Sequence, residues 1–193
     1  MSAPIVLASS SPRRKQLLEM LRIPFRVVAP EVDEHVLAGE APRDYVTRLS
    51  RVKAEAVAAR APGELVLAAD TTVVLDGEII GKPESAADAV AMLSRLQGRT
   101  HEVMTAVALR RDGELAGALD VSRVTFRPMD RASLEAYVAT GEPLDKAGAY
   151  AIQGVGAVLI ANVDGDVYGV MGLPLGPVVD LLARFGRPYR FTR

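Results

Sequence analysis

The sequence contains no cysteine and only two histidines, His35 and His101. Without cysteine, disulfide bonds, thiolate zinc sites and a cysteine nucleophile are all excluded. Two histidines argue against a metal site built from several imidazoles. Any metal must therefore be held by carboxylates, and magnesium or manganese are the cations that suit such oxygen ligands.

Long apolar runs and a strong excess of one charge are also lacking. No apolar stretch approaches the roughly 18 residues of a membrane helix, and the N-terminus shows no basic region followed by a long apolar segment. We therefore expect a cytoplasmic protein with no membrane partner. The net charge of −1 argues against a nucleic-acid partner. The 193 residues, 49% hydrophobic and 24% charged, are typical of one globular domain over residues 1–193.

The spacing of apolar residues predicts alternating strands and helices. Strands are expected at 5–7, 24–29, 65–69, 73–75, 78–80, 101–109, 115–126, 157–162 and 167–170. Helices are expected at 12–21, 42–61, 86–96, 131–140 and 174–185. Asp76-Gly77 and Asp112-Gly113 fit the tight turns of two antiparallel hairpins. We therefore expect a mixed β-sheet flanked by helices, in an α/β or α+β arrangement.

The turn between the first strand and the first helix reads Ser9-Ser10-Ser11-Pro12-Arg13-Arg14-Lys15. Ser11 suits the N-cap and Pro12 the first helical position, so three cations fall in the first helical turn. Because the helix N-terminus is itself positive, each exposed cation there costs about 0.3–1 kcal/mol. A bound anion would remove this conflict. Helix N–H groups, arginine forks and lysine together suit a phosphate chain.

Asp70 follows the apolar run of residues 65–69 directly. A carboxylate in this position is expected at the rim of the sheet, where open α/β sheets bind their ligands. The alternative is a structural role in which Asp70 caps a turn through the N–H of Thr72. Lys53 lies at the flank of a helix and Lys82 follows a hairpin, and both positions also suit solvated surface cations. The acidic loop that contains Glu34 also fits a solvated loop.

Three segments of this sequence together resemble the Maf nucleoside triphosphate pyrophosphatases. They are LASSSPRR from residue 7, ADTTV from residue 69 with GKP from residue 81, and DKAGAYAIQG from residue 145. The resemblance implies an inosine-triphosphatase-like (Maf/Ham1-like) fold, a homodimer, a divalent cation, and cleavage of a nucleoside triphosphate substrate into monophosphate and pyrophosphate. The third segment is similar to the branch that hydrolyses dTTP and UTP, except that Ala151 stands where glycine is expected.

The resemblance also implies roles for individual residues. Asp70 would accept a proton from the water that attacks the α-phosphorus, and Asp70 and Glu34 would hold the metal. Base selection is linked to Arg13, Thr71 and Gln153. The remaining residues would bind the phosphates; they are Ser9, Ser11, Arg14, Lys53 and Lys82.

Other functions remain open at this point. A second branch of the same family acts on 7-methyl-GTP. Members are also named for an association with septum formation, so a nucleotide-binding regulator without turnover is an alternative. Nucleic-acid binding through residues 13–15 is disfavoured by the neutral charge and by the lack of aromatic residues among the cations.

Overall fold

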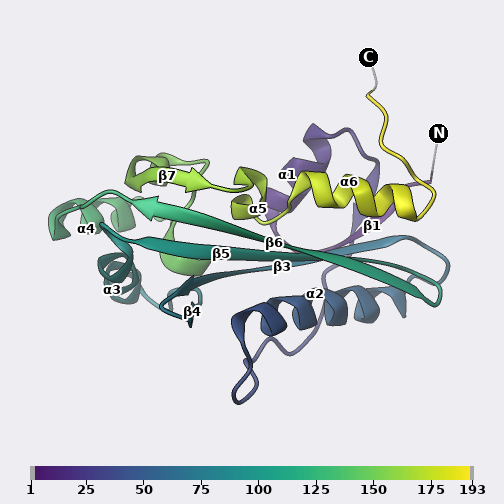
Figure 1. Cartoon of the computed structure of the whole chain (residues 1–193), viewed down its shortest axis with the longest axis horizontal. Helices are drawn as coiled ribbons and strands as arrows, with labels where there is room; N and C mark the ends of the chain where they lie inside the picture. The colour runs from purple at the N-terminus through teal and green to yellow at the C-terminus, as the bar shows by residue number, and fades with distance from the viewer. Residues whose placement is uncertain (1–2, 192–193) are drawn as a thin grey trace.

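The computed structural model describes residues 3–191, so both ends of the expected domain 1–193 lie outside the described residues. Within this range seven strands form one sheet in the order β2-β1-β3-β5-β6-β7, and β4 pairs with β3 (Figure 1). The strands are β1 (Ile5–Ala8), β2 (Phe25–Val27), β3 (Val66–Leu75), β4 (Glu78–Ile80), β5 (Thr100–Arg111), β6 (Glu114–Phe126) and β7 (Ile160–Asp164). Strand β1 is parallel to β2 and β3, and the other pairs are antiparallel. The mixed sheet predicted from the sequence is confirmed.

Helices cover both faces of this sheet. They are α1 (Pro12–Met20), α2 (Pro42–Ala58), α3 (Ala86–Leu96), α4 (Arg131–Ala139), α5 (Val167–Met171) and α6 (Leu175–Arg184), with 3₁₀ turns η1 (Ala147–Ala149) and η2 (Val155–Leu159). Figure 1 shows α2 on one face and α1 and α6 on the other. No helix among residues 3–191 is long and apolar enough to span a membrane.

Strand β1 shows how the two faces are filled. All four of its side chains are buried, as expected for a strand covered by helices on both sides. Ile5 and Leu7 pack in the core formed with α1 and α6, whereas Val6 and Ala8 pack against α2. This alternation continues in β3, where Leu67 faces α1 and α6.

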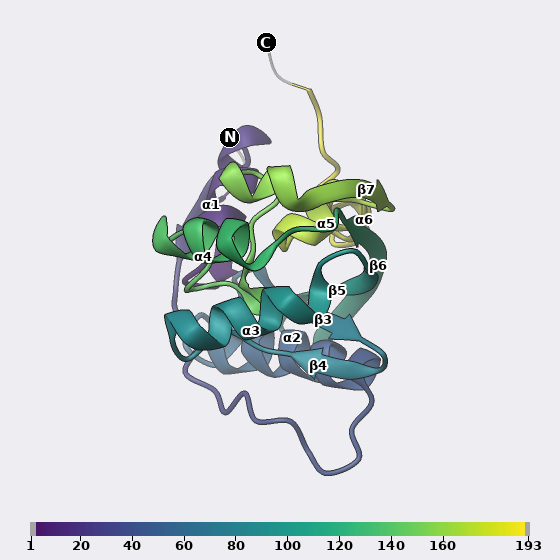
Figure 2. The ribbon, with the colours of Figure 1, turned by 90° about the vertical axis from the view of Figure 1, so that its left-hand side faces the viewer.

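A second core lies at the other end of the long strands. There α3 and α4 pack over the ends of β3, β5 and β6, around the fully buried Phe126. Figure 2 views the molecule from this end. The side chains of the β1–α1 turn and of the middle of β3 lie between the two cores. These side chains include serine, aspartate and threonine, so polar groups gather between the two apolar cores, as in a ligand site.

The structure corrects three predicted elements. The predicted strand at 167–170 is wrong: this segment is α5, because Asp166 caps it by accepting from the N–H of Tyr168 at 2.8 Å. The predicted strand at 157–162 begins only at Ile160, after η2. The strand predicted to end at Ala69 instead runs on to Leu75 as β3. Short apolar runs fit a strand or a helix equally well, so only tertiary context decides between them.

Candidate active site

A cavity of about 560 Å³ opens between the two cores. Its volume lies within the roughly 300–1,000 Å³ typical of small-molecule sites. Every residue that the sequence singled out for binding, catalysis or metal lies along its wall: Ser9, Ser11, Arg13, Arg14, Glu34, Lys53, Asp70, Thr71, Lys82 and Gln153. These residues come from α1, α2, β3 and four loops. The structure therefore brings the predicted set together, while the role of each residue stays a prediction.

Asp70 lies in the middle of β3 and not at a strand end, which corrects both the rim position and the turn-capping alternative. Residues 66, 68 and 70 share one face of β3, so Asp70 points toward α2. There its Oδ1 accepts from Lys53 Nζ at 2.6 Å. Lys53 is buried rather than at the surface flank of α2, and its Nζ also lies 2.8 Å from Oε1 of Glu34. One ammonium thus joins two carboxylates.

Burial raises the pKa of Asp70, and the positive charges of Lys53 and Arg14 oppose this shift without cancelling it. Asp70 is only 6% exposed, so its carboxylate has little water to stabilise its charge. A raised pKa brings a carboxylate closer to the range in which it accepts a proton effectively. This combination of burial, a defined partner and a cavity wall is typical of catalytic carboxylates.

The loop that contains Glu34 is held against α2 by two side chains. The hydroxyl of Tyr45 donates to the backbone oxygen of Glu34 at 3.0 Å. Arg48 donates to the backbone oxygen of His35 at 3.0 Å and forms an ion pair with Glu40. Burial, followed by the charge of Asp70, raises the pKa of Tyr45 to about 12, so the phenol stays protonated. The apolar spacing of the helix that contains Tyr45 gives no sign of this hydrogen bond to the Glu34 loop.

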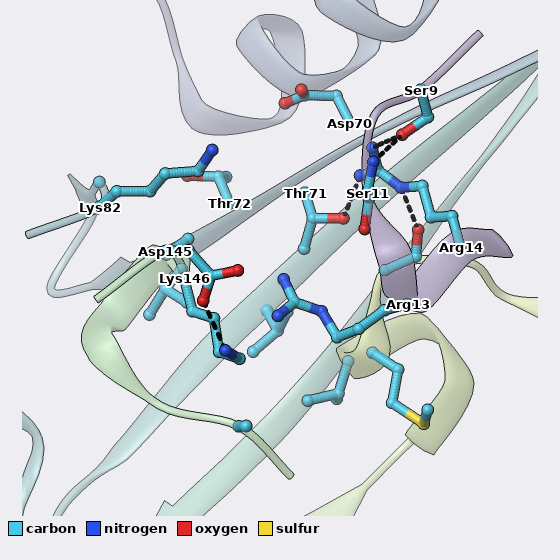
Figure 3. A pocket seen from close by; sticks show the side chains of 18 of the residues that line it. Ser9, Ser11, Arg13, Arg14, Asp70, Thr71, Thr72, Lys82, Asp145 and Lys146 are labelled. Atoms are coloured by element: carbon cyan, nitrogen blue, oxygen red, sulfur yellow. Dashed lines mark hydrogen bonds and ion pairs between the residues drawn. The ribbon is translucent and has the colours of Figure 1, made fainter. Parts of the chain in front are cut away.

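The β1–α1 turn is organised by Arg14 and Ser9. The Arg14 guanidinium donates to the backbone oxygen of Gly172 at 2.8 Å, to Ser9 Oγ at 3.2 Å and to Thr71 Oγ1 at 3.0 Å (Figure 3). Ser9 Oγ also accepts from the N–H of Ser11 at 3.1 Å. The side chain of Ser11, the expected N-cap, makes no capping hydrogen bond. Three of the five N–H groups of Arg14 are thus occupied, and two remain for a ligand.

Thr105 supports Thr71 from behind the cavity wall, and the sequence did not reveal it. It is fully buried on β5, and its hydroxyl donates to the backbone oxygen of Gly169 at 2.7 Å and lies 3.0 Å from Thr71 Oγ1. Since a threonine hydroxyl has one hydrogen, Thr71 is left to donate to Thr105 while it accepts from Arg14. A threonine inside a long strand gives no sequence signal of such a link.

Arg13, Asp145 and Gln153 lie around a second hollow of about 350 Å³, and the same three residues also line the first. Figure 3 shows the Arg13 guanidinium extending toward Asp145. Burial lowers the pKa of Arg13, and the charge of Asp145 opposes this shift. Lys15, the third cation of the turn, lines neither hollow. The cation cluster of the sequence thus divides into two site residues and one surface residue.

The loop at 145–150 is fixed against the β3–β4 hairpin. The N–H of Gly148 donates to the backbone oxygen of Gly81 at 2.9 Å, which ties this loop to the residue before Lys82. Gly148 has a φ of +70°, and a Cβ there would lie 2.9 Å from a methyl carbon of Val73. The position therefore requires glycine for both its conformation and its space.

Asp70 and Glu34 are the residues that could hold a metal. Both contact the same Lys53 nitrogen, so the two carboxylates are neighbours with the Lys53 ammonium between them. Residues 3–191 contain no group of three or more carboxylates and imidazoles suited to a metal. Mg²⁺ is commonly held by one or two carboxylates together with substrate phosphates and water. The two carboxylates therefore fit a magnesium ion that is completed by the substrate.

Comparisons with known proteins show the family and the fold of this chain. Residues 4–185 match the family model described as Maf-like protein. The chain is 53% identical over 184 residues to the dTTP/UTP pyrophosphatase of Symbiobacterium thermophilum, with 95% of each chain covered. It is 55% identical over 185 residues to the dTTP/UTP pyrophosphatase of Myxococcus xanthus, with 95% of this chain and 93% of that protein covered. The structure of the Staphylococcus aureus Ham1 protein is similar with a TM-score of 0.54 at 16% identity, covering 95% of this chain and 97% of that one, which shows a shared fold. The chain belongs to the Maf-like protein family.

Proposed function

We propose that this chain hydrolyses dTTP and UTP to the nucleoside monophosphate and pyrophosphate. The observation that supports this most strongly is the buried Asp70–Lys53 pair at the wall of a cavity that is also lined by Arg13, Arg14 and Lys82. A buried proton acceptor among phosphate-binding cations suits the hydrolysis of a phosphoanhydride. The names of the relatives that are 53% and 55% identical support the same activity.

In this proposal Asp70 accepts the proton of the water that attacks the α-phosphorus. The bond from the α-phosphorus to the oxygen bridging to the β-phosphate breaks, and pyrophosphate leaves with that oxygen. Lys53 orients the Asp70 carboxylate through its hydrogen bond at 2.6 Å. Phosphoryl transfer needs mainly positioning and charge stabilisation from the protein, which fixed side chains supply.

The triphosphate is bound at the β1–α1 turn. The first N–H groups of α1 face no acidic side chain in that turn, and Arg14 has two free N–H groups beside them. Lys82 lies on the opposite side of the cavity (Figure 3). A chain of phosphates between these groups would compensate the cations that oppose the helix dipole.

Asp70 and Glu34 would hold a Mg²⁺ or Mn²⁺ ion through their oxygens. The ion would supply a positive charge that neutralises the charge developing on the phosphates. Lys53 already joins the same two carboxylates, so it keeps them close together whether or not a cation is bound.

Recognition of the base is assigned to Gln153 and Arg13, which line both hollows. Thymine and uracil present two carbonyl acceptors beside one N–H donor, and a glutamine amide offers both a donor and an acceptor. Thr71 was linked to base selection by resemblance, but its hydroxyl is bonded to Arg14 and lies 3.0 Å from Thr105. In this proposal Thr71 therefore acts by orienting Arg14.

Product analysis by ³¹P NMR tests the proposal. Incubation with dTTP and Mg²⁺ should give dTMP and pyrophosphate in equal amounts. Release of inorganic phosphate with dTDP would contradict cleavage at the α-phosphorus. If neither dTTP nor UTP gives a product, the alternative of a nucleotide-binding regulator without turnover remains. If only 7-methyl-GTP gives a product, the chain has the activity of the second branch of the family. The homodimer implied by resemblance stays a prediction, which analytical ultracentrifugation decides.

A further inference from the structure

We propose that Tyr137 and Glu142 are positioning residues that set the geometry of the Gln153 loop and thereby the selectivity for the base. This inference rests on the proposed function, because it assumes that Gln153 contacts the base of a nucleotide. Neither residue lines the larger cavity, and Glu142 lies at the wall of the second hollow together with Arg13 and Gln153.

The two side chains hold the loop at both of its ends. The Tyr137 hydroxyl accepts from the N–H of Ala151 at 3.2 Å and donates to Glu142 Oε1 at 2.9 Å. The Glu142 carboxylate then accepts from the N–H of Val155 and from the N–H of Gly156, each at 2.9 Å. The segment 151–156 is therefore bonded before and after Gln153 by one connected pair.

The glycines of this loop fit the same pair. A Cβ on Gly154 would lie 1.9 Å from Glu142 Oε2, and a Cβ on Gly156 would lie 2.4 Å from the Tyr137 hydroxyl oxygen. At both glycines the loop backbone lies so close to the side chains of the pair that a Cβ atom would clash with them. The Gly-Val-Gly sequence after Gln153 is too short for a dinucleotide-binding motif, and this close approach explains it.

The pair itself is firmly held. Tyr137 is 8% exposed and belongs to the core formed with α3 and α4. Partial burial raises the pKa of Glu142, but hydrogen bonds from Gly156, Tyr137 and Val155 outweigh it, so the net shift is downward and the carboxylate stays ionised. Charge-assisted hydrogen bonds of this kind are stronger than neutral ones. The loop is therefore tied to a rigid helix through an ionised acceptor.

The pair also reaches the other side of the second hollow. The backbone oxygen of Glu142 accepts from Lys146 Nζ at 2.5 Å, and the same nitrogen forms an ion pair with Asp145 at 2.5 Å. Asp145 in turn faces Arg13. Glu142 thus bonds to the backbone that follows Gln153 and to Lys146, whose partner Asp145 faces Arg13.

Steady-state kinetics with dTTP and CTP test the inference on the full chain. Tyr137→Phe removes the hydroxyl and keeps the ring, and Glu142→Gln removes the charge and keeps the shape. The matched controls are Tyr168→Phe, at a 40% exposed residue, and Glu135→Gln, at an exposed residue of α4. Each test variant should lower the ratio of kcat/KM for dTTP to that for CTP by about tenfold, which corresponds to one lost hydrogen bond of about 1.4 kcal/mol. The controls should keep the wild-type ratio.

A purely structural role would lower the rates with both nucleotides equally and leave the ratio unchanged, and that result would overturn the inference. An unchanged ratio in both variants, with wild-type melting temperatures, would overturn it as well. If Tyr137→Phe does not fold, Glu142→Gln decides alone, because its side chain is partly exposed. A wild-type chain that is inactive on dTTP and UTP would instead refute the proposed function, so the two failures are distinguishable.

Discussion

Replacing Asp70 by asparagine should abolish catalysis without harming the fold. The amide cannot accept the proton of the attacking water and is a poor ligand for a hard cation. Loss of a general base lowers the rate about 10²–10⁴-fold. The expected loss of kcat/KM for dTTP is therefore at least about 100-fold.

The stability of this variant follows from the charges around Asp70. Its pKa in the folded chain lies above the ordinary value of 3.8, so the folded state holds this proton more tightly than the unfolded chain does. Ionisation of Asp70 therefore lowers the free energy of unfolding as the pH rises through 3.8 and through the higher folded value. Asparagine removes this cost. Lys53 keeps a charged partner, since Glu34 stays at 2.8 Å.

Asp70→Asn should thus not show the loss of roughly 3–5 kcal/mol that breaking a buried ion pair costs. In metal-free buffer at neutral pH we expect the melting temperature of Asp70→Asn to equal or exceed that of the wild type, with the difference disappearing below pH 3.8. Pyrophosphate release and thermal unfolding measure the two effects, and Asp180→Asn at an exposed position of α6 is the matched control. A variant that keeps more than about half of the wild-type rate would refute the role of Asp70 as general base. A large drop in melting temperature would refute the charge argument.

Three further predictions concern the cavity walls and the ligand. Gly148→Ala should lower stability by about 1–3 kcal/mol through its positive φ and its contact with Val73, and chemical denaturation measures this; an unchanged midpoint would contradict the strain. Thr105→Val should cost about 0.5–1.5 kcal/mol by removing the hydrogen bond to the oxygen of Gly169, which keeps the N–H of Gly172 as a donor, and it should also raise KM for dTTP, whereas Thr105→Ser should restore both. Saturating dTTP should raise the melting temperature more with Mg²⁺ than with EDTA, because only the folded chain binds both; equal shifts would argue against the metal site.

The sequence predicted most of the framework because local patterns determine it. The helix expected at 86–96 matches α3, since Ser85 caps it and accepts from the N–H of Asp88. The two Asp-Gly hairpins also form, because a tight turn needs only its own residues and an alternating pattern on either side. The Maf resemblance and the Ham1-like fold are confirmed by the family match and by the structural neighbour.

What the sequence did not predict depends on contacts between distant segments. Periodicity placed Lys53 at the flank of a helix, but its burial follows from how α2 packs against Asp70 on β3. Thr105 and Glu142 bond to residues 64 and 13–14 positions away, and no local pattern encodes such partners. The segment 167–170 is apolar enough for a strand, but as α5 it lies against β5, where the backbone oxygen of Gly169 accepts from the hydroxyl of Thr105.

Specificity constants for dTTP, UTP, CTP, GTP and 7-methyl-GTP under identical conditions with Mg²⁺ test the central claim most directly. A site that pairs Gln153 with the N–H and carbonyl groups of thymine and uracil should reject cytosine, which reverses the donor and acceptor at two positions. Buried groups left unpaired allow discrimination on the order of 10⁴ in the best cases. We predict high and similar kcat/KM for dTTP and UTP, and values at least about 100-fold lower for the other three. Comparable values for CTP or 7-methyl-GTP would contradict the account.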